Sequence, residues 1–257
     1  MVHYSYLVNH IRRHIGPCGV AVSGGTDSTL LLRAAADALG ERLLALSVVT
    51  PYTISREHDA LRMWTESLGV RHIVLTLPLI DALRFNPENR CYLCKHAIML
   101  AMCQRSREEG FSILIEGTNA DDMPRDRPGM KALKELGIKS PLRGCGVTKQ
   151  DVRRWLTIHG HPAAERQSNS CLLTRLPYGM EVRTADLARI ETAENYLLDL
   201  GARYVRVRQR GDHADVEIDP ESRAAFFCHD GYRGIVAKME ELGFMAATIV
   251  EELRRSC

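Results

Sequence analysis

A glycine-rich turn between an apolar run and a helical pattern carries the strongest chemical signal in this 257-residue chain. In the stretch AVSGGTDSTLLL, the residues Ser23, Gly24 and Gly25 follow the apolar run directly. Such a turn points backbone N–H groups and a helix N-terminus at an anion, and glycine lets the backbone approach it closely. Ser23 and Ser28 can add hydroxyl donors, and Asp27 is compatible with a phosphate if it helps to hold Mg²⁺. The Gly-Lys-Ser/Thr ending of a Walker A loop is missing, so we predict a phosphate loop of another kind.

Cysteine thiols are the second group of residues that could do chemistry. Cys91 and Cys94 have the C-x-x-C spacing, which suits a shared metal centre or a redox pair. Cys171 lies in the stretch SNSCLLTRLPYG, where the positive charge of Arg175 would favour the thiolate. Three thiolates can hold a 4Fe–4S cluster and leave one iron open to a fourth ligand. The alternatives are a helix-capping pair without a metal and a loop thiol without a role.

Arginines that alternate along a predicted strand could bind a phosphate. Arg206 and Arg208 are two residues apart and therefore point to the same face of the strand. Two guanidinium groups on one face suit a phosphate monoester, although a charged, solvent-exposed sheet face has the same pattern. Thr118 ends a separate predicted strand, at the carboxyl edge where open α/β sheets bind ligands.

These residues need a scaffold, and the first half of the chain predicts one in which strands and helices alternate. Apolar runs predict strands at residues 18–22, 42–49, 71–77 and 111–118. Helical spacing and glycine stops predict the intervening helices at 26–40, 56–69 and 91–110. This alternation is typical of a parallel sheet covered by helices on both faces, so the predicted fold class is α/β.

The pattern changes after residue 120. A polar, proline-rich loop at 121–130 is followed by two short helices at 131–137 and 148–160. An irregular stretch at 161–180 comes next. A new unit then reads as a helix at 184–201, strands at 202–209 and 213–219 around a Gly211-Asp212 turn, a helix at 229–243 and a strand or helix at 244–253. We therefore predict two domains, 1–180 and 181–257, of which the second is a smaller α+β domain.

Composition limits the classes of protein to which the chain can belong. Hydrophobic residues make up 45% and charged residues 26%, as in ordinary globular proteins. The net charge of +2 gives no global electrostatic reason to expect a nucleic-acid or membrane partner. The first residues lack the apolar core of a signal peptide, and no stretch is apolar over a membrane-spanning length, which favours the cytoplasm. We then expect the eight cysteines to stay reduced.

The motifs resemble those of a known superfamily and of one family within it. The loop SGGTDS is similar to the SGG-x-DS motif of the PP-loop ATP pyrophosphatases, which cleave ATP between the α and β phosphates. A wider set resembles the ATP-dependent sacrificial sulfur transferases that serve biosynthesis of the nickel-pincer nucleotide cofactor: SGGTDS, NRCYLCK, EGTNADD, DRPGMKALKELGIKSPL, TKQDVR, SCLLTRLPYG, RYVRVR and ADVEID. The resemblance implies a PP-loop domain, adenylation of a substrate carboxylate with ATP and Mg²⁺, and insertion of sulfur to give a thiocarboxylate. It also implies a small nucleotide substrate, a pyridinium dicarboxylate mononucleotide, and assembly as a homo-oligomer.

The resemblance implies a role for each candidate residue. ATP and Mg²⁺ are assigned to Ser23, Gly24, Gly25, Asp27, Ser28, Ser47, Thr118 and Lys149, with Asp27 also a catalytic candidate. The substrate phosphate is assigned to Arg206 and Arg208. In one subtype a cysteine at the place of Cys171, a catalytic candidate together with Arg175, gives up its own sulfur and is left as dehydroalanine. In another, cysteines placed like Cys91, Cys94 and Cys171 hold a 4Fe–4S cluster, and because this sequence has all three, we expect the cluster subtype.

Three other functions fit parts of the sequence. A tRNA-thiolating PP-loop enzyme would need a basic RNA-binding surface, which the net charge does not favour. An iron–sulfur or zinc-binding module with an inactive PP-loop would not need the intact SGGTDS set. An amide-forming PP-loop ligase that uses free ammonia would leave the three cysteines without a role.

Overall fold

The structure is a computed structural model that describes residues 3–122, 129–165, 169–222 and 229–250. Contacts divide the chain into two compact units. The first comprises Met1–Thr50, Ser55–Ile80 and Asn89–Asn169, and the second comprises Pro51–Ile54, Asp81–Glu88 and Ser170–Cys257. The functional domain limits 1–180 and 181–257 stay a prediction. Some predicted features fall on residues outside the described ranges: the middle of the loop 121–130, part of the irregular stretch 161–180, the end of the last element, Cys228 and Cys257.

A parallel sheet forms the centre of the first unit, as the alternation of strands and helices predicts. In the described part of the chain it has four strands in the order β3-β2-β1-β4, and every neighbouring pair is parallel. The strands are β1 (Cys18–Ala21), β2 (Leu43–Val49), β3 (His72–Thr76) and β4 (Leu114–Ile115). In the central strand, Val20 is in register with Ala45 of β2 and Ile115 of β4. The predicted α/β class is therefore confirmed.

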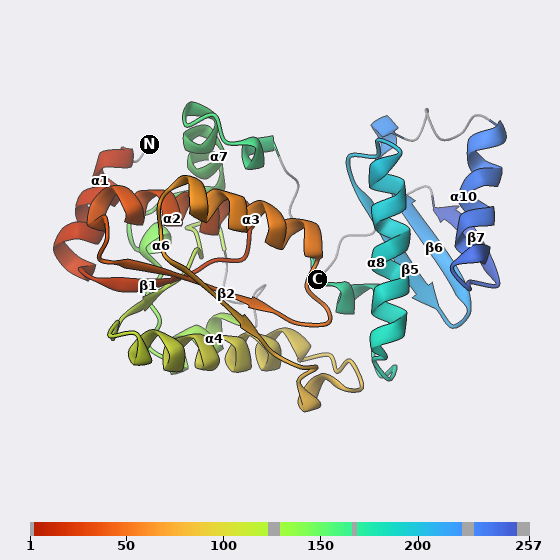
Figure 1. The fold of residues 1–257 in the computed structure, drawn as a ribbon, viewed down its shortest axis with the longest axis horizontal. Coiled ribbons are helices and arrows are strands. Elements are labelled where there is room, and N and C mark those ends of the chain that lie inside the picture. The colour runs from red at the N-terminus through yellow and green to blue at the C-terminus, as the bar shows by residue number, and fades with distance from the viewer. Residues whose placement is uncertain (1–2, 123–128, 166–168, 223–228, 251–257) are drawn as a thin grey trace. The chain divides into compact units, whose positions relative to one another are not determined.

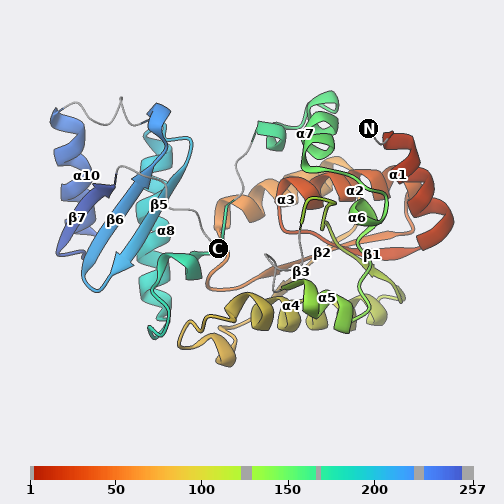
Figure 2. The ribbon, with the colours of Figure 1, turned by 180° about the vertical axis from the view of Figure 1, so that it is seen from behind.

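Helices cover both faces of this sheet (Figures 1 and 2). One face carries α1 (Tyr4–His10) with the turn η1 (Ile11–Ile15), α2 (Thr26–Leu39), α3 (Ser55–Ser67), α6 (Pro141–Gly144), α7 (Lys149–Ile158) and η4 (Pro162–Glu165). The other face carries α4 (Arg90–Glu108) and α5 (Gly129–Glu135). Met99 of α4 and Leu133 of α5 share a core with Leu44 and Leu46 of β2. Among the helices of the described residues, none has the length and apolar character that crossing a bilayer requires.

The fourth strand is much shorter than the predicted strand at 111–118. The strand ends at Ile115, which also forms an isolated parallel bridge with Lys139, and Glu116 N donates to the carbonyl oxygen of Lys139 at 3.0 Å. Gly117 then lies against the start of α2, where an added Cβ would sit 2.8 Å from the backbone nitrogen of Ser28. This close backbone approach requires glycine.

The second unit contains a smaller sheet with helices beside it. In the described residues, antiparallel β5 (Val205–Arg210) and β6 (His213–Ile218) form a hairpin, and β7 (Ala246–Val250) adds a parallel strand to β6. Gly211 turns the hairpin with a φ of +63°, as the predicted Gly211-Asp212 turn requires. The other elements are η2 (Asp81–Leu83), η5 (Leu172–Arg175), α8 (Thr184–Asp199) and α10 (His229–Glu241). The last element, left open as a strand or a helix, is thus a strand.

Candidate functional site

The predicted phosphate loop connects the end of β1 to the start of α2. Gly24 has a φ of +79°, and a Cβ on it would lie 2.7 Å from the main-chain oxygen of Glu57. Both features require glycine at this position. Ser28 Oγ donates to the carbonyl oxygen of Gly25 at 3.0 Å and accepts from Ser23 N at 3.2 Å, so the two serines shape the loop. The first N–H groups of α2 are thereby placed at the carboxyl edge of the sheet, where they can bind an anion.

A lysine from α7 adds a positive charge to the loop. Lys149 Nζ lies 2.9 and 2.8 Å from the two carboxylate oxygens of Asp27, and it also donates to Thr26 Oγ1. Asp121 Oδ2 accepts from the backbone nitrogen of Lys149 at 2.7 Å and so fixes the start of α7. The structure therefore brings Lys149 to the loop, 122 residues along the chain from Asp27. A Mg²⁺ ion held by Asp27 would share this carboxylate with the ammonium group.

A buried carboxylate organises the sheet edge next to the loop. Glu116, which is 4% exposed, accepts from Thr118 N at 3.0 Å, from Thr118 Oγ1 at 2.8 Å and from Ser140 Oγ at 2.5 Å. Lys95 Nζ lies 3.5 Å from its second oxygen. Thr118 Oγ1 thus donates its hydrogen to the carboxylate of Glu116. Sequence reasoning missed Glu116 and Lys95, although both lie inside the quoted motifs EGTNADD and NRCYLCK.

Ser47 lies on β2, but its hydroxyl group is used inside the protein. Its Oγ lies 2.8 Å from Nε2 of His72 on β3, and the residue is only 2% exposed. The side chain of Ser47 therefore connects β2 to β3 through its hydrogen bond with His72. The sequence predictions did not include His72.

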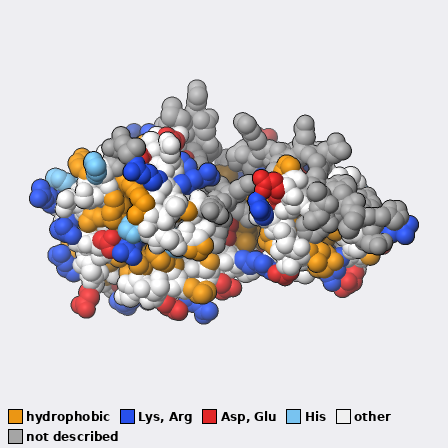
Figure 3. All heavy atoms as spheres, turned by 90° about the horizontal axis from the view of Figure 1, so that it is seen from above, with side chains coloured by type: hydrophobic (Ala, Val, Ile, Leu, Met, Phe, Trp, Pro, Cys, Tyr) orange, Lys and Arg blue, Asp and Glu red, His pale blue; other side chains and the backbone are white. Residues whose placement is uncertain are grey.

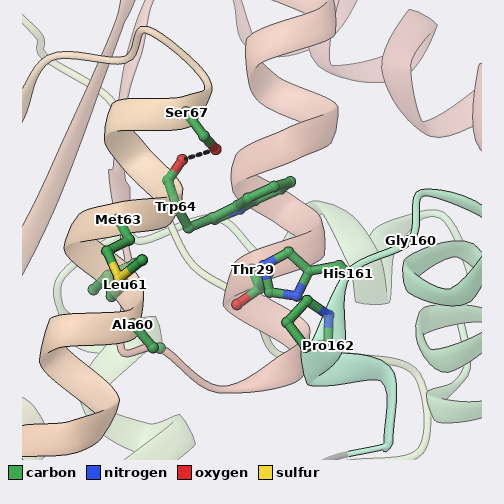
Figure 4. Close-up of a pocket in the computed structure, with 10 residues that line it drawn as sticks. Thr29, Ala60, Leu61, Met63, Trp64, Ser67, Gly160, His161 and Pro162 are labelled. Atoms are coloured by element: carbon green, nitrogen blue, oxygen red, sulfur yellow. Dashed lines mark hydrogen bonds between the residues drawn. The ribbon is translucent and has the colours of Figure 1, made fainter.

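An apolar pocket of about 260 Å³ opens beside the loop, between α2, α3 and residues 160–162 (Figure 4). Gly24 and Thr29 line one side of it. Trp64 and His161 also line it, and their rings meet edge to face with centroids 4.2 Å apart. Its walls are mostly apolar, so they do not suit a phosphate, and they leave α3 incompletely packed against α2.

The cysteines fall into two groups by burial. Cys18, Cys103 and Cys145 are buried core residues. Their burial raises the pKa of the Cys18 thiol to about 12 and also raises the pKa values of the Cys103 and Cys145 thiols. Cys91 and Cys94 lie in the first two turns of α4, three residues apart and so on one side of the helix, where Cys91 is exposed and Cys94 partly exposed.

Cys171 belongs to the second unit, where it is partly exposed and precedes η5. In the described part of the chain, no group of three or more His, Cys, Asp or Glu side chains is arranged to hold a metal ion. The donor chemistry of the three accessible thiols nevertheless matches what a 4Fe–4S cluster takes.

Arg175 holds the loop around Cys171 from the inside. The residue is 1% exposed, and its Nε and Nη2 donate to the carboxylate of Glu194 on α8 at 2.8 and 3.1 Å. Its Nη1 donates to the carbonyl oxygen of Ser170 at 2.8 Å and lies 3.4 Å from that of Cys171. Glu194 also accepts from Val207 N at 2.9 Å. Arg175 thus ties the Cys171 loop to α8 and β5, whereas its effect on the thiolate stays a prediction.

A second clamp comes from Asn86, which sequence reasoning missed. This fully buried residue has a φ of +43°, and its Nδ2 lies within 2.9–3.2 Å of three carbonyl oxygens. The acceptors belong to Leu173, Leu176 and Pro177, which follow Cys171. A weak signal was present, since asparagine tolerates a positive φ better than most residues.

The two predicted phosphate-binding arginines lie on β5, next to the Cys171 loop. Arg208 donates to Glu217 Oε1 at 2.6 Å through Nε and to the carbonyl oxygen of Thr174 at 3.0 Å through Nη1. Arg206 lies over the ring of Tyr204, 5.0 Å from its centroid. Burial is the largest cause that lowers the pKa of Arg206. An anion beside this desolvated guanidinium would be stabilised.

Figure 3 shows the charged side chains of the described residues on one face. Lys and Arg side chains are scattered there among acidic and hydrophobic ones and do not form one patch. A binding surface for RNA would show a continuous basic stripe.

Comparisons with known proteins agree with these motifs. No protein-family model matches the chain. It is 34% identical over 232 residues to an uncharacterized protein of Synechocystis, and this covers 90% of the chain and 87% of the relative. It is 30% identical over 233 residues to the pyridinium-3,5-bisthiocarboxylic acid mononucleotide synthase of Lactiplantibacillus plantarum, covering 90% of the chain and 84% of the synthase. A shorter match, 28% identical over 120 residues, joins 46% of the chain to 39% of one component of the glutamine-hydrolyzing GMP synthase of Methanosphaerula palustris.

Proposed function

Because the chain belongs to the PP-loop family of the pyridinium-3,5-bisthiocarboxylic acid mononucleotide synthase, we propose that it is an ATP-dependent sulfurtransferase. Its substrate is a pyridinium mononucleotide that carries a carboxylate, and its product is the thiocarboxylate. The observation that carries the proposal is the link in the second unit between Arg208 and the Cys171 loop, through the carbonyl oxygen of Thr174. A substrate whose phosphate is bound on β5 would have its carboxylate within the reach of this loop.

The first half of the reaction is adenylation at the loop between β1 and α2. Ser23, Gly24, Gly25 and Ser28 bind the phosphates of ATP and Lys149 offsets their charge, while Asp27 would hold a Mg²⁺ ion that offsets it further. The substrate carboxylate oxygen attacks the α phosphorus, and pyrophosphate leaves. The product is an acyl-adenylate, in which AMP is a good leaving group.

The second half transfers sulfur. The Cys171 thiolate attacks the acyl carbon and expels AMP, which forms a thioester. Removal of the Cα proton of Cys171 then breaks its Cβ–S bond, which leaves a thiocarboxylate on the substrate and dehydroalanine in the protein. Alternatively, Cys91, Cys94 and Cys171 would hold a 4Fe–4S cluster, which would supply an exchangeable sulfur atom and allow repeated turnover. We propose this cluster form because the chain has all three cysteines.

The phosphate of the substrate binds at Arg206 and Arg208. Arg206 is the stronger candidate because burial lowers its pKa, so that a phosphate would restore the favourable environment of its charge. Arg208 already donates hydrogen bonds to Glu217 and to the carbonyl oxygen of Thr174, and it orients the site. We also propose that the protein forms a homo-oligomer, which light scattering can test.

The test combines product and protein analysis. Anaerobically purified protein is assayed for iron and sulfide and incubated with Mg²⁺, ATP and pyridinium-3,5-dicarboxylate mononucleotide. We expect AMP, pyrophosphate and thiocarboxylate, with bound iron that is lost in Cys91→Ala. Iron-free protein whose mass falls by that of one H₂S per chain, as cysteine becomes dehydroalanine and its sulfur passes to the substrate, would identify Cys171 as the sulfur source. A Cys171→Ala protein that still makes thiocarboxylate would overturn both forms, and AMP formation that depends on tRNA would favour a tRNA-thiolating enzyme.

A further inference from the structure

His72, the first residue of β3, connects three elements of the first unit through its side chain. Its Nε2 lies 2.8 Å from Ser47 Oγ on β2, and its Nδ1 lies 3.1 Å from Thr65 Oγ1 on α3. Ser47 is 2% exposed and Thr65 is 0% exposed. Because these hydroxyl groups are shielded from solvent, the proton of each must find an acceptor inside the protein.

The direction of every proton in this chain of hydrogen bonds follows from one further contact. Thr65 Oγ1 donates its single hydrogen to the carbonyl oxygen of Arg62 at 2.8 Å. Towards His72 it can therefore only accept, so Nδ1 of His72 carries the proton. In the neutral ring Nε2 is then an acceptor, and Ser47 donates to it. Burial, then the neighbouring His58, lowers the pKa of His72, and Glu66 acts in the opposite direction. This environment keeps the neutral form.

The tie matters because α3 has few buried side chains. Its fully buried side chains are Leu61 and Thr65, and its other side borders the 260 Å³ pocket (Figure 4). The N-terminal turn of α3 also contacts the phosphate loop, where the Glu57 carbonyl oxygen lies against Gly24. A shift of α3 would therefore be transmitted directly to the loop.

We infer that His72 is a positioning residue for ATP: its neutral Nδ1–H tautomer fixes α3 against β2 and thereby keeps the Glu57 carbonyl oxygen against Gly24 of the phosphate loop. The inference rests on the proposed function only in that this loop binds ATP. It does not depend on the source of the sulfur or on the acceptor.

The test is direct binding of α,β-methylene-ATP with Mg²⁺ to the full chain by calorimetry. His72→Phe keeps an aromatic ring but loses both hydrogen bonds, so we expect the Kd to rise about tenfold, as for loss of a buried partner. His72→Asn keeps a donor for Thr65 but no acceptor for Ser47, as the protonated imidazole does, so its Kd should also be raised. Ser106→Ala is the matched control, because it removes another buried hydrogen bond, 2.9 Å long, from α4 on the opposite face of the sheet. It should leave the Kd unchanged.

The pH dependence separates positioning from a general loss of structure. Protonation of His72 deprives the Ser47 hydroxyl of its acceptor, so wild-type affinity should fall as the pH drops through the lowered pKa of His72. His72→Phe has no such group. The ratio of its Kd to that of the wild type should therefore approach one in acid.

Three results would overturn the inference. Either wild-type affinity in His72→Phe, equal weakening by Ser106→Ala, or a ratio of Kd values that does not change with pH would exclude a positioning role for His72. Wild-type protein that binds no nucleotide would overturn this inference together with the proposed function. Normal binding without thiocarboxylate formation would overturn the proposed function alone.

Discussion

Replacing Glu194 by glutamine tests whether the buried charge of Arg175 is held by its partner. Glutamine keeps the shape of the side chain and an oxygen that can accept from Val207 N, but it removes the negative charge. Leaving one partner of a buried ion pair uncompensated costs about 3–5 kcal/mol. Because Arg175 holds the carbonyl oxygens of Ser170 and Cys171, the loss should fall on the second unit and on its cysteine loop.

The assay must report the two units separately. Both tryptophans, Trp64 and Trp155, lie in the first unit, so their fluorescence in urea should be nearly unchanged in Glu194→Gln. Hydrogen exchange of the amides in α8 and β5 should instead become faster by the factor that corresponds to about 3–5 kcal/mol. Glu221→Gln is the control, since it breaks an exposed ion pair with Arg203 in the same unit. If exchange in Glu194→Gln rises no more than in this control, the pairing argument is wrong.

Three further outcomes follow from the phosphate loop and the thiols. Gly24→Ala should lose ATP binding by at least tenfold in calorimetry, because its Cβ would lie 2.7 Å from a main-chain oxygen, whereas Gly25→Ala meets its nearest atom at 3.5 Å and should bind nearly normally. Lys149→Met should weaken binding of Mg²⁺-ATP by about ten- to a hundredfold, because it removes a cation and leaves Asp27 without this partner beside the phosphates. A variant that binds Mg²⁺-ATP like the wild type would exclude a role of Lys149 in phosphate binding. Iodoacetamide at pH 7 should modify the accessible thiols of iron-free protein, which are those of Cys91, Cys94 and Cys171. It should spare the buried thiols with raised pKa values, which are those of Cys18, Cys103 and Cys145. Peptide mass spectrometry reads out the modified sites, and faster modification of the buried set would contradict this division.

The elements that were predicted well are those whose signals are local. The helix that starts after Gly25 follows from its position between an apolar run and a helical pattern, and the hairpin follows from Gly211 with its positive φ. The strand at 111–118 was predicted too long for an equally physical reason. Its last apolar residue is Ile115, and Gly117 then lies against the backbone of Ser28, a residue far away in the sequence.

The supporting residues of the site could not be predicted because their partners are distant in sequence. Asn86 contacts acceptors 87 to 91 residues away, and Lys149 meets Asp27 at a separation of 122. No spacing rule connects such positions, since only the packed fold brings them together. His72 is a similar case, because its effect depends on a third contact, from Thr65 to the carbonyl oxygen of Arg62, that decides the tautomer.

The arginines show why residue type alone does not assign a role. Arg175, Arg206 and Arg208 all appear in the sequence as cations near a predicted reaction centre, and each could be assigned to an anionic ligand. In the structure Arg175 is enclosed and paired with Glu194, and Arg208 is divided between Glu217 and the Thr174 carbonyl oxygen. These two charges therefore shape the loop that presents Cys171. Arg206 differs because burial lowers its pKa while its guanidinium lies over the ring of Tyr204, so a bound phosphate would stabilise it most. Loss of Arg206 should then weaken substrate binding, whereas loss of Arg175 should disorder the cysteine loop itself.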